Sequence, residues 1–292
     1  VVSGDFWGWL QDTAAVRIRA AANNLICFIG YCLKSSYKFS IFAQQNKQEM
    51  TKPDPKAVKD PMGAAIYEYF TLGKSARLRV FSPDFEEDEI PVSELFRDFG
   101  QMPYLEKVAL EMCQGAILDV GAGSGCHSVA LGQMGKSATA VDISPLSVEV
   151  MRLRGVKGVL ADFYDRDFAG QYDTILMLMN GSGIVGRVDN FPRFFGRVRE
   201  LLRPGGCVLM DSSDLRYLYE DEDGSFAIDL AGDYYGELQY QMQYRDIKGD
   251  LFDWLYVDFQ TLSYYAQQSG FRAELVAEGE HFDYLAKIYI DK

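Results

Sequence analysis

Three glycines stand at every second position in one short segment, where an apolar run gives way to polar residues. The segment reads Ile117-Leu118-Asp119-Val120-Gly121-Ala122-Gly123-Ser124-Gly125-Cys126-His127. Glycine lets the backbone turn sharply and lets a ligand approach where a Cβ would collide. A helix expected directly after the loop presents unpaired N–H groups to a polar ligand. The segment therefore predicts a ligand-binding turn, and the alternative is a tight strand-to-helix turn without a chemical role.

The spacing of these glycines separates two kinds of nucleotide ligand. Dinucleotide-binding loops follow the pattern GxGxxG, in which a diphosphate sits at the helix N-terminus. Here the pattern is GxGxG, and Asp119 precedes it by two positions. A carboxylate would be poorly placed beside a diphosphate. The spacing therefore argues against a nicotinamide-dependent oxidoreductase on a Rossmann sheet, which is the main alternative among enzymes.

Two further acids follow the next two predicted strands. Asp142 ends the second strand, where a carboxylate can accept hydrogen bonds from both ribose hydroxyls; its alternative role is to cap the following helix. Asp162 follows the third strand and can accept from an adenine amino group, while Phe163 or Ile143 flanks the ring. The three elements lie at the carboxyl ends of consecutive strands, where open α/β sheets bind ligands.

Short apolar strands alternate with helices from residue 116 onward, which indicates βαβ units and a parallel sheet. Strands are expected at residues 116–120, 137–142, 158–161, 172–178 and 207–211. Helices are expected at residues 126–134, 145–154, 188–202 and 259–269. Period-two alternation at 234–244 and 251–258 predicts an inserted β-hairpin between strands five and six. With final strands at 271–278 and 284–290, the predicted fold is α/β, a mostly parallel seven-stranded sheet flanked by helices.

The residues before the sheet divide into two regions. Residues 50–114 are predicted to form a helical cap, with helices at 62–70, 91–99 and 103–112 and a strand at 76–81. Residues 1–49 differ in composition from the rest of the chain, and we expect them to be an upstream extension whose deletion leaves folding and cofactor binding intact. The main domain is predicted at residues 115–292, with the hairpin insertion at 234–258.

These residues resemble the class I, Rossmann-like S-adenosylmethionine-dependent methyltransferases. Residues 119–125 are similar to the family's first motif, Asp142 to its ribose-binding acid, and Asp162-Phe163 to its adenine-side motif. Residues 173–183 are similar to the fourth-strand motif, with Asn180 and Gly181 facing the substrate. The resemblance covers about residues 104–292, and the cap and hairpin look like those of small uncharacterised bacterial members. It implies S-adenosylmethionine as cofactor, S-adenosylhomocysteine as product, and in-line methyl transfer to a nucleophile.

The motif positions give a set of candidate residues. The candidate cofactor-binding residues are Asp119, Gly121, Ala122, Gly123, Ser124, Gly125, Asp142, Ile143, Asp162, Phe163, Asn180 and Gly181. Many amino-methylating members carry Asn-Pro-Pro-Tyr after strand four, whereas this chain has Asn180-Gly181-Ser182-Gly183, which argues against adenine- or glutamine-type chemistry. Asn180 and His127 are the catalytic candidates, since histidine is the commonest acid–base residue. The alternative for His127 is a structural role.

The hairpin is rich in aromatic residues and is expected to overhang the acceptor site. The predicted acceptor pocket consists of Tyr67, Tyr235, Trp254 and Tyr256. We favour an apolar wall over an aromatic cage for a cation. Asp211 and Asp214 suggest a metal-assisted site as an alternative. The preferred interpretation is a solvated loop with a helix cap, so no metal is expected.

Composition narrows the class of acceptor. The 292-residue chain has a formal net charge of -13, which repels phosphate backbones and makes a nucleic-acid acceptor less favourable than a small molecule. Five cysteines without CxxC spacing indicate reduced thiols in a cytoplasmic protein. The apolar stretch at residues 20–33 is too short to cross a bilayer. A module that binds the cofactor without transferring the methyl group is the remaining alternative.

Overall fold

The computed structural model describes residues 59–219 and 232–291. The predicted extension at residues 1–49, the first part of the predicted cap and the apolar stretch at 20–33 lie outside the described residues. Within the described ranges, no helix combines the length and the apolar character needed to cross a membrane.

Seven strands form the main sheet, in the order β11-β12-β7-β6-β3-β4-β5. Their bounds are β3 (Ile117–Val120), β4 (Ala138–Asp142), β5 (Lys157–Leu160), β6 (Tyr172–Met177), β7 (Leu202–Ser213), β11 (Arg272–Glu278) and β12 (Asp283–Tyr289). Only β12 runs antiparallel to its neighbours in this sheet. The predicted seven-stranded, mostly parallel sheet is therefore confirmed. β7 begins earlier than expected because Leu202 already pairs with Tyr172 before a register shift.

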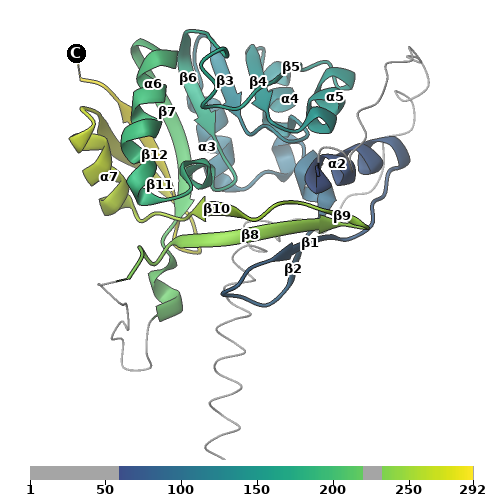
Figure 1. Ribbon diagram of the computed structural model, residues 1–292. Helices are drawn as coiled ribbons and strands as arrows, with labels where there is room; N and C mark the ends of the chain where they lie inside the picture. The colour runs from purple at the N-terminus through teal and green to yellow at the C-terminus, as the bar shows by residue number, and fades with distance from the viewer. Residues whose placement is uncertain (1–58, 220–231, 292) are drawn as a thin grey trace, which may run out of the picture.

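Helices cover both faces of this sheet (Figure 1). One face carries α3 (Tyr104–Met112), α4 (Cys126–Gln133) and α5 (Pro145–Leu153), and the other carries α6 (Phe191–Leu201) and α7 (Phe259–Gln268). Neighbouring strand residues point to opposite sides: Leu118 packs with the α6 and α7 residues, whereas Ile117 packs with those of α3 and α4. Burial on both faces explains why the strands are continuous apolar runs.

A second sheet lies along one side of the main domain, and we call it the accessory sheet (Figure 1). It contains β1 (Leu78–Phe81), β2 (Asp88–Ile90), β8 (Glu237–Tyr244), β9 (Ile247–Lys248) and β10 (Phe252–Leu255), all paired antiparallel. The predicted hairpin is present as β8 and β10, but β8 also pairs with β1. The region predicted as a helical cap therefore contributes two strands to the insertion.

Two local expectations in the cap region were wrong. No strand was expected at β2, whose Asp88 and Glu89 are poor strand formers and are extended because they pair with β1. The helix expected at 91–99 is replaced by two 3₁₀ turns, η2 (Val92–Phe96) and η3 (Phe99–Gln101). Asp98 caps η3 through a reciprocal capping box with Gln101, which starts a new turn where the helix was expected to continue.

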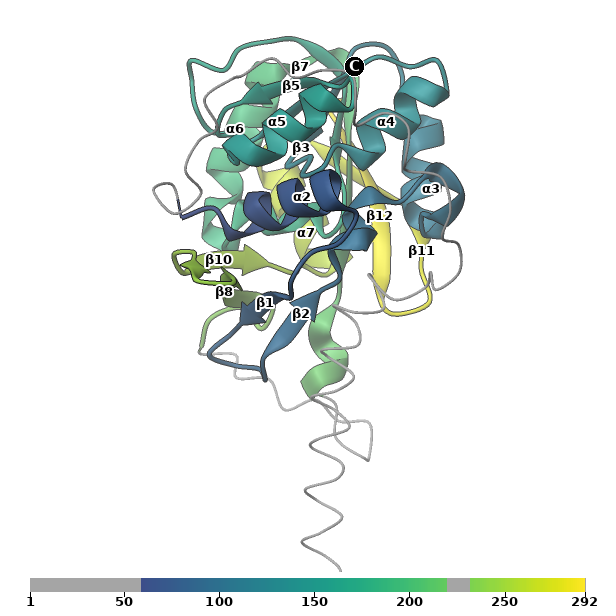
Figure 2. The same ribbon diagram turned by 90° about the vertical axis from the view of Figure 1, so that its right-hand side faces the viewer.

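Helix α2 (Pro61–Leu72) lies between α5 and the accessory sheet, as two views at right angles show (Figures 1 and 2). Asp60 caps this helix by accepting a hydrogen bond from the Gly63 N–H at 2.8 Å. Its other carboxylate oxygen accepts from the Ser144 hydroxyl at 2.7 Å, at the start of α5. A Cβ at Gly63 would lie 2.2 Å from the Asp60 carboxylate, so only glycine allows this contact. One carboxylate thus fixes α2 over the carboxyl end of β4.

Candidate active site

The glycine loop after β3 is held in a conformation that L side chains rarely adopt. Gly121, Gly123 and Gly125 have φ angles of 67°, 55° and 79°. The Gly121 N–H donates to the Val141 carbonyl at 2.9 Å, which ties the loop to the end of β4. A Cβ at Gly125 would lie 2.9 Å from the Met151 side chain. Backbone conformation and close packing therefore both require glycine here, as the spacing predicted.

Asp142 stands at the end of β4 and faces this loop. Its Oδ2 accepts from the Gly123 N–H and its Oδ1 from the Ser144 N–H, both at 2.8 Å. Each carboxylate oxygen retains a further lone pair, so the group can also accept from a diol. Burial raises the pKa of Asp142 to about 6, although the two backbone donors act in the opposite direction. Beside it Ile143 is 73% exposed and offers an apolar platform next to the carboxylate.

The two residues predicted for the adenine side lie in different environments. Asp162 is exposed and accepts from the Tyr164 N–H at 2.8 Å. Phe163 is only 4% exposed and packs its ring 5.9 Å from that of Phe194 in the core. A ring packed in the core cannot flank a ligand. Of the two residues predicted to flank the adenine, the structure therefore leaves Ile143 at the surface.

Two other predicted cofactor-binding residues lie beneath the loop. Asp119 is 1% exposed and accepts from the Ser128 hydroxyl at 2.7 Å. Ser124, equally buried, donates to the Leu95 carbonyl and accepts from the Arg154 guanidinium. Both side chains are thus used to hold the loop against its supports, α4 and η2. Sequence spacing does not reveal this, because η2 joins the loop only through the tertiary fold.

His127 is the partner of a buried ion pair. It is 4% exposed, and its Nε2 lies 3.0 Å from Glu106, whose other oxygen accepts from Arg97 at 2.7 Å. Burial alone would lower the pKa of His127, but the neighbouring Cys126 and the carboxylates of Glu106 and Asp119 raise it to about 10. A group with this pKa is protonated at neutral pH and accepts no proton. The structure therefore argues against His127 as a catalytic base and gives it the role of joining α3 to α4.

Asn180 lies in a turn directly after β6. Its Nδ2 donates to the Leu255 carbonyl at 3.1 Å, and its Oδ1 accepts from the Ser182 hydroxyl at 3.3 Å. The side chain is 5% exposed. Both ends of the amide are therefore bonded to the protein and tie the turn to β10. In this arrangement Asn180 supports the site rather than presenting a free catalytic group.

Asp211 and Asp214, considered above as metal ligands, have other partners. Asp211 is completely buried and accepts from the backbone N–H groups of Met179 at 3.1 Å and Gly181 at 2.8 Å. Asp214 pairs with Arg216 and accepts from the Tyr235 hydroxyl at 2.8 Å. Among residues 59–219 and 232–291, no group of three or more His, Cys, Asp or Glu is arranged to hold a metal ion.

Three of the four predicted acceptor residues gather under the accessory sheet. Tyr235, Trp254 and Tyr256 belong to one apolar cluster, and Tyr67 belongs to the neighbouring cluster. Met242 of β8 packs against both clusters and so connects them. The Trp254 ring lies against Gly183 of η4 (Gly181–Val185), where an added Cβ would be 2.0 Å from the ring.

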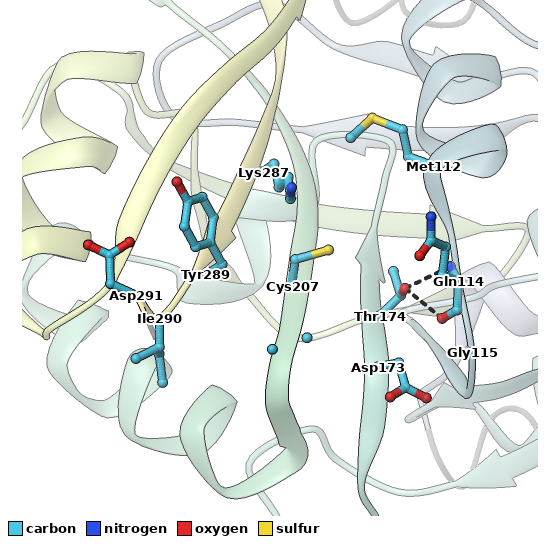
Figure 3. A pocket seen from close by; sticks show the side chains of 12 residues that line it. Met112, Gln114, Gly115, Asp173, Thr174, Cys207, Lys287, Tyr289, Ile290 and Asp291 are labelled. Atoms are coloured by element: carbon cyan, nitrogen blue, oxygen red, sulfur yellow. Dashed lines mark hydrogen bonds between the residues drawn. The ribbon is translucent and has the colours of Figure 1, made fainter.

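An open cavity of about 780 Å³ lies at the opposite edge of the main sheet (Figure 3). Its lining includes Gln114, Asp173, Thr174, Cys207 and Lys287. Thr174 exchanges hydrogen bonds with the backbone of Gln114, and Asp173 accepts from Ala116 and Arg203. Thr174, Gln114 and Asp173 thus already have hydrogen-bond partners within the protein. Volume alone therefore does not make it the site.

Comparisons with known proteins identify the family of this chain. The family described as "Methyltransferase domain" matches residues 117–206, from the start of β3 into β7. The crystal structure of an S-adenosylmethionine-dependent methyltransferase from Bacteroides fragilis, in complex with S-adenosylhomocysteine, is 62% identical. Its TM-score is 0.76, over 80% of this chain and 96% of that one. The CcbJ methyltransferase of Streptomyces caelestis shares the fold, with 17% identity and a TM-score of 0.50 over 67% of this chain and 99% of that chain.

A Rossmann-like sheet with a left-handed glycine loop and an acid at the end of the next strand defines a nucleoside-binding protein. The similarity to the Bacteroides fragilis methyltransferase decides which nucleoside is bound. The chain belongs to the S-adenosylmethionine-dependent methyltransferases, and S-adenosylmethionine is its cofactor. A curated relative, cypemycin N-terminal methyltransferase of a Streptomyces species, is 31% identical over 102 residues, which are 34% of this chain. The match spans 42% of that relative's length, less than half.

Proposed function

We propose that this chain transfers the methyl group of S-adenosylmethionine to a small molecule held between the carboxyl edge of the main sheet and the accessory sheet. The observation that carries this proposal is the Asp142 carboxylate, fixed beside the left-handed glycine loop at the end of β4. The turn after β6 lies beside the same loop, since Ile184 of η4 is 3.2 Å from the position of an added Cβ at Gly121. The bound cofactor supplies an activated methyl group, so the protein has mainly to align the acceptor with it.

The accessory sheet supports the acceptor side of this proposal. β10 brings Trp254 against η4, close to the turn that follows β6, and Tyr240 belongs to the same apolar cluster as Trp254. Tyr67 approaches from α2, whose Ile66 lies 3.8 Å from the position of an added Cβ at Gly123. Aromatic and aliphatic groups on three elements thus surround the path of an acceptor. The net charge of -13 favours neutral or cationic acceptors over phosphorylated ones.

An amino nitrogen is the acceptor chemistry to test first. The curated relative is named as an N-terminal methyltransferase, and a neutral amine attacks a sulfonium without prior loss of a proton. This fits a site whose buried histidine, His127, is already protonated. Primary and secondary amines and short peptides should therefore be offered first, with formation of S-adenosylhomocysteine as the readout. Absence of turnover with every acceptor class would favour the alternative of a cofactor-binding module.

The cofactor site is tested by isothermal titration of S-adenosylhomocysteine into the wild type and the Asp142→Ala variant. Two hydrogen bonds to a charged acceptor are worth about 3 kcal/mol together, so the affinity should fall about a hundredfold. Asp142→Asn, which keeps the shape of the side chain, should show most of this loss. Asp167→Ala removes an exposed acid from a nearby loop and should bind like the wild type. Equal affinity in all four proteins would disprove the assignment of Asp142.

A further inference from the structure

The turn after β6 stores backbone strain at the edge of the site. Met179 and Asn180 have φ angles of 64° and 60°, in the left-handed region that L side chains avoid. Within residues 59–219 and 232–291, no other two consecutive residues apart from glycine share this conformation. Such strain persists only where surrounding contacts impose it, and it is concentrated at functional sites.

Asp211 supplies those contacts. From the carboxyl end of β7, its two oxygens accept from the N–H groups of Met179 and Gly181, on either side of Asn180. The carboxylate is completely buried, although burying a charge is unfavourable. The turn is thus held by a group whose ionised form costs the fold stability. A residue selected only for stability would not need a buried charge here.

The turn that Asp211 holds connects the two sides of the proposed site. Ile184 of η4 lies 3.2 Å from the position of an added Cβ at Gly121, so η4 packs against the glycine loop. The neighbouring residue of η4, Gly183, contacts the Trp254 ring of the accessory sheet. A change in the turn therefore alters the cofactor side and the acceptor side together.

We propose that Asp211 is a positioning residue for methyl transfer, which holds the left-handed Met179–Asn180 turn in the geometry that aligns cofactor and acceptor. The inference rests on the proposed function. It assigns a role to an acid that the sequence predicted in a solvated loop, with metal binding as the alternative, and that the structure buries within β7. Asp211 acts through the backbone of the turn and does not touch the reacting atoms.

The charged and titratable groups around Asp211 define the pH dependence of this device. Glu106 on α3, His127 on α4, Tyr256 after β10 and Tyr284 on β12 face it. Burial and the Glu106 carboxylate raise the pKa of Asp211 to about 7, although the Gly181 N–H favours the ionised form. Because this value exceeds that of the unfolded chain, the folded protein takes up the proton first. The contribution of Asp211 to stability therefore declines as the pH rises from about 4 through about 7.

The test compares Asp211→Asn with Asp173→Asn, a matched change at the other end of the sheet. Asp173 also accepts a backbone N–H, that of Ala116, but lies at the start of β6. In Asp211→Asn we expect about a tenfold loss of S-adenosylhomocysteine affinity and faster amide exchange at residues 178–186. Because the contribution of Asp211 to stability declines with rising pH, the melting temperature of the wild type relative to that of Asp211→Asn should fall between pH 5 and pH 8. Asp173→Asn should keep wild-type affinity and wild-type exchange at residues 178–186.

A rescue separates positioning from a general structural role. Glycine adopts the left-handed conformation without a Cβ clash. Met179→Gly should therefore recover part of the affinity lost in Asp211→Asn, and it serves as a second variant if the single change folds poorly. Wild-type affinity and exchange in Asp211→Asn would overturn the inference while leaving the proposed function intact. A folded wild type that fails to bind S-adenosylhomocysteine would instead overturn the proposed function.

Discussion

The two edges of the main sheet hold their acids in opposite ways. At the carboxyl edge, Asp142 and Asp211 are surrounded by backbone donors and protein, and burial raises the pKa of both. At the amino edge, Asp173 lies at the surface, where the Ala116 N–H and the Arg203 guanidinium lower its pKa. At the carboxyl edge, burial makes the ionised form of the acids unfavourable. At the amino edge, the ionised form of Asp173 is stabilised by its partners and lies near solvent.

This difference supports the proposed site at the carboxyl edge, which the shape of the surface alone does not indicate. The open cavity of about 780 Å³ is at the amino edge (Figure 3), where Thr174 and Asp173 already have hydrogen-bond partners. The strained Met179–Asn180 turn, the glycine loop after β3 and two acids of raised pKa, Asp142 and Asp211, are at the carboxyl edge. Perturbed titration and backbone strain are typical of functional sites because both are unfavourable unless they serve a purpose.

The largest expected effect on stability comes from the buried ion network beside the carboxyl edge. Glu106→Gln removes the charge between His127 and Arg97, and the free energy of unfolding should fall by about 3–5 kcal/mol because buried His127 loses its carboxylate partner and Arg97 keeps the more distant Glu94, at 3.6 Å. Urea unfolding measures this loss. Glu111→Gln changes an exposed acid on the same helix and should stay within about 0.5 kcal/mol of the wild type. Similar values for both variants would contradict the contrast between buried and exposed charges.

A smaller effect is expected where the accessory sheet meets the carboxyl edge. Gly183→Ala places a Cβ against the Trp254 ring, and overpacking of this kind costs about 1–3 kcal/mol. The matched change Gly196→Ala lies on the exposed face of α6 with no atom within 4 Å of the added Cβ. It should stabilise the protein by about 0.5–1 kcal/mol, since alanine is the better helix former. Thermal unfolding of both variants measures these changes in stability. If Gly183→Ala has the stability of the wild type, the Trp254 ring moves aside without cost.

The smallest expected effect is the response of the cofactor site to acid. Because the pKa of Asp142 is about 6, its side chain is almost fully ionised above about pH 7 and becomes protonated as the pH falls. The protonated form is a weaker acceptor of hydrogen bonds. The affinity for S-adenosylhomocysteine should therefore be nearly constant at neutral pH and fall about fivefold between pH 6 and pH 5. Titration calorimetry across this range checks the slope, and Asp142→Asn should remove it. Asp173, whose pKa is lowered, stays ionised throughout and leaves the amino edge unchanged.

The sequence determined the order of strands and helices in the main domain and the position of its glycine loop. Apolar runs, their period and the GxGxG spacing are local signals, and the structure places β3, the loop and α4 where these signals predicted them. The same signals gave Asp142 as the candidate ribose-binding acid, which stays a prediction. An acid–proline pair, Asp60-Pro61, also marked the start of α2, one residue before the helix was expected.

Only the tertiary structure decided which of the candidate residues remain available for chemistry. Phe163 and His127 are buried among partners that come from distant parts of the chain, and Asp119 is buried against Ser128, nine residues further on. The pairing of β1 with β8 and the contact of Asp211 with the turn after β6 are likewise long-range. Spacing along a chain fixes which face or edge a side chain occupies. The burial, hydrogen-bond partners and pKa of that side chain depend on the segments that pack against it. The local sequence does not reveal which distant segments these are.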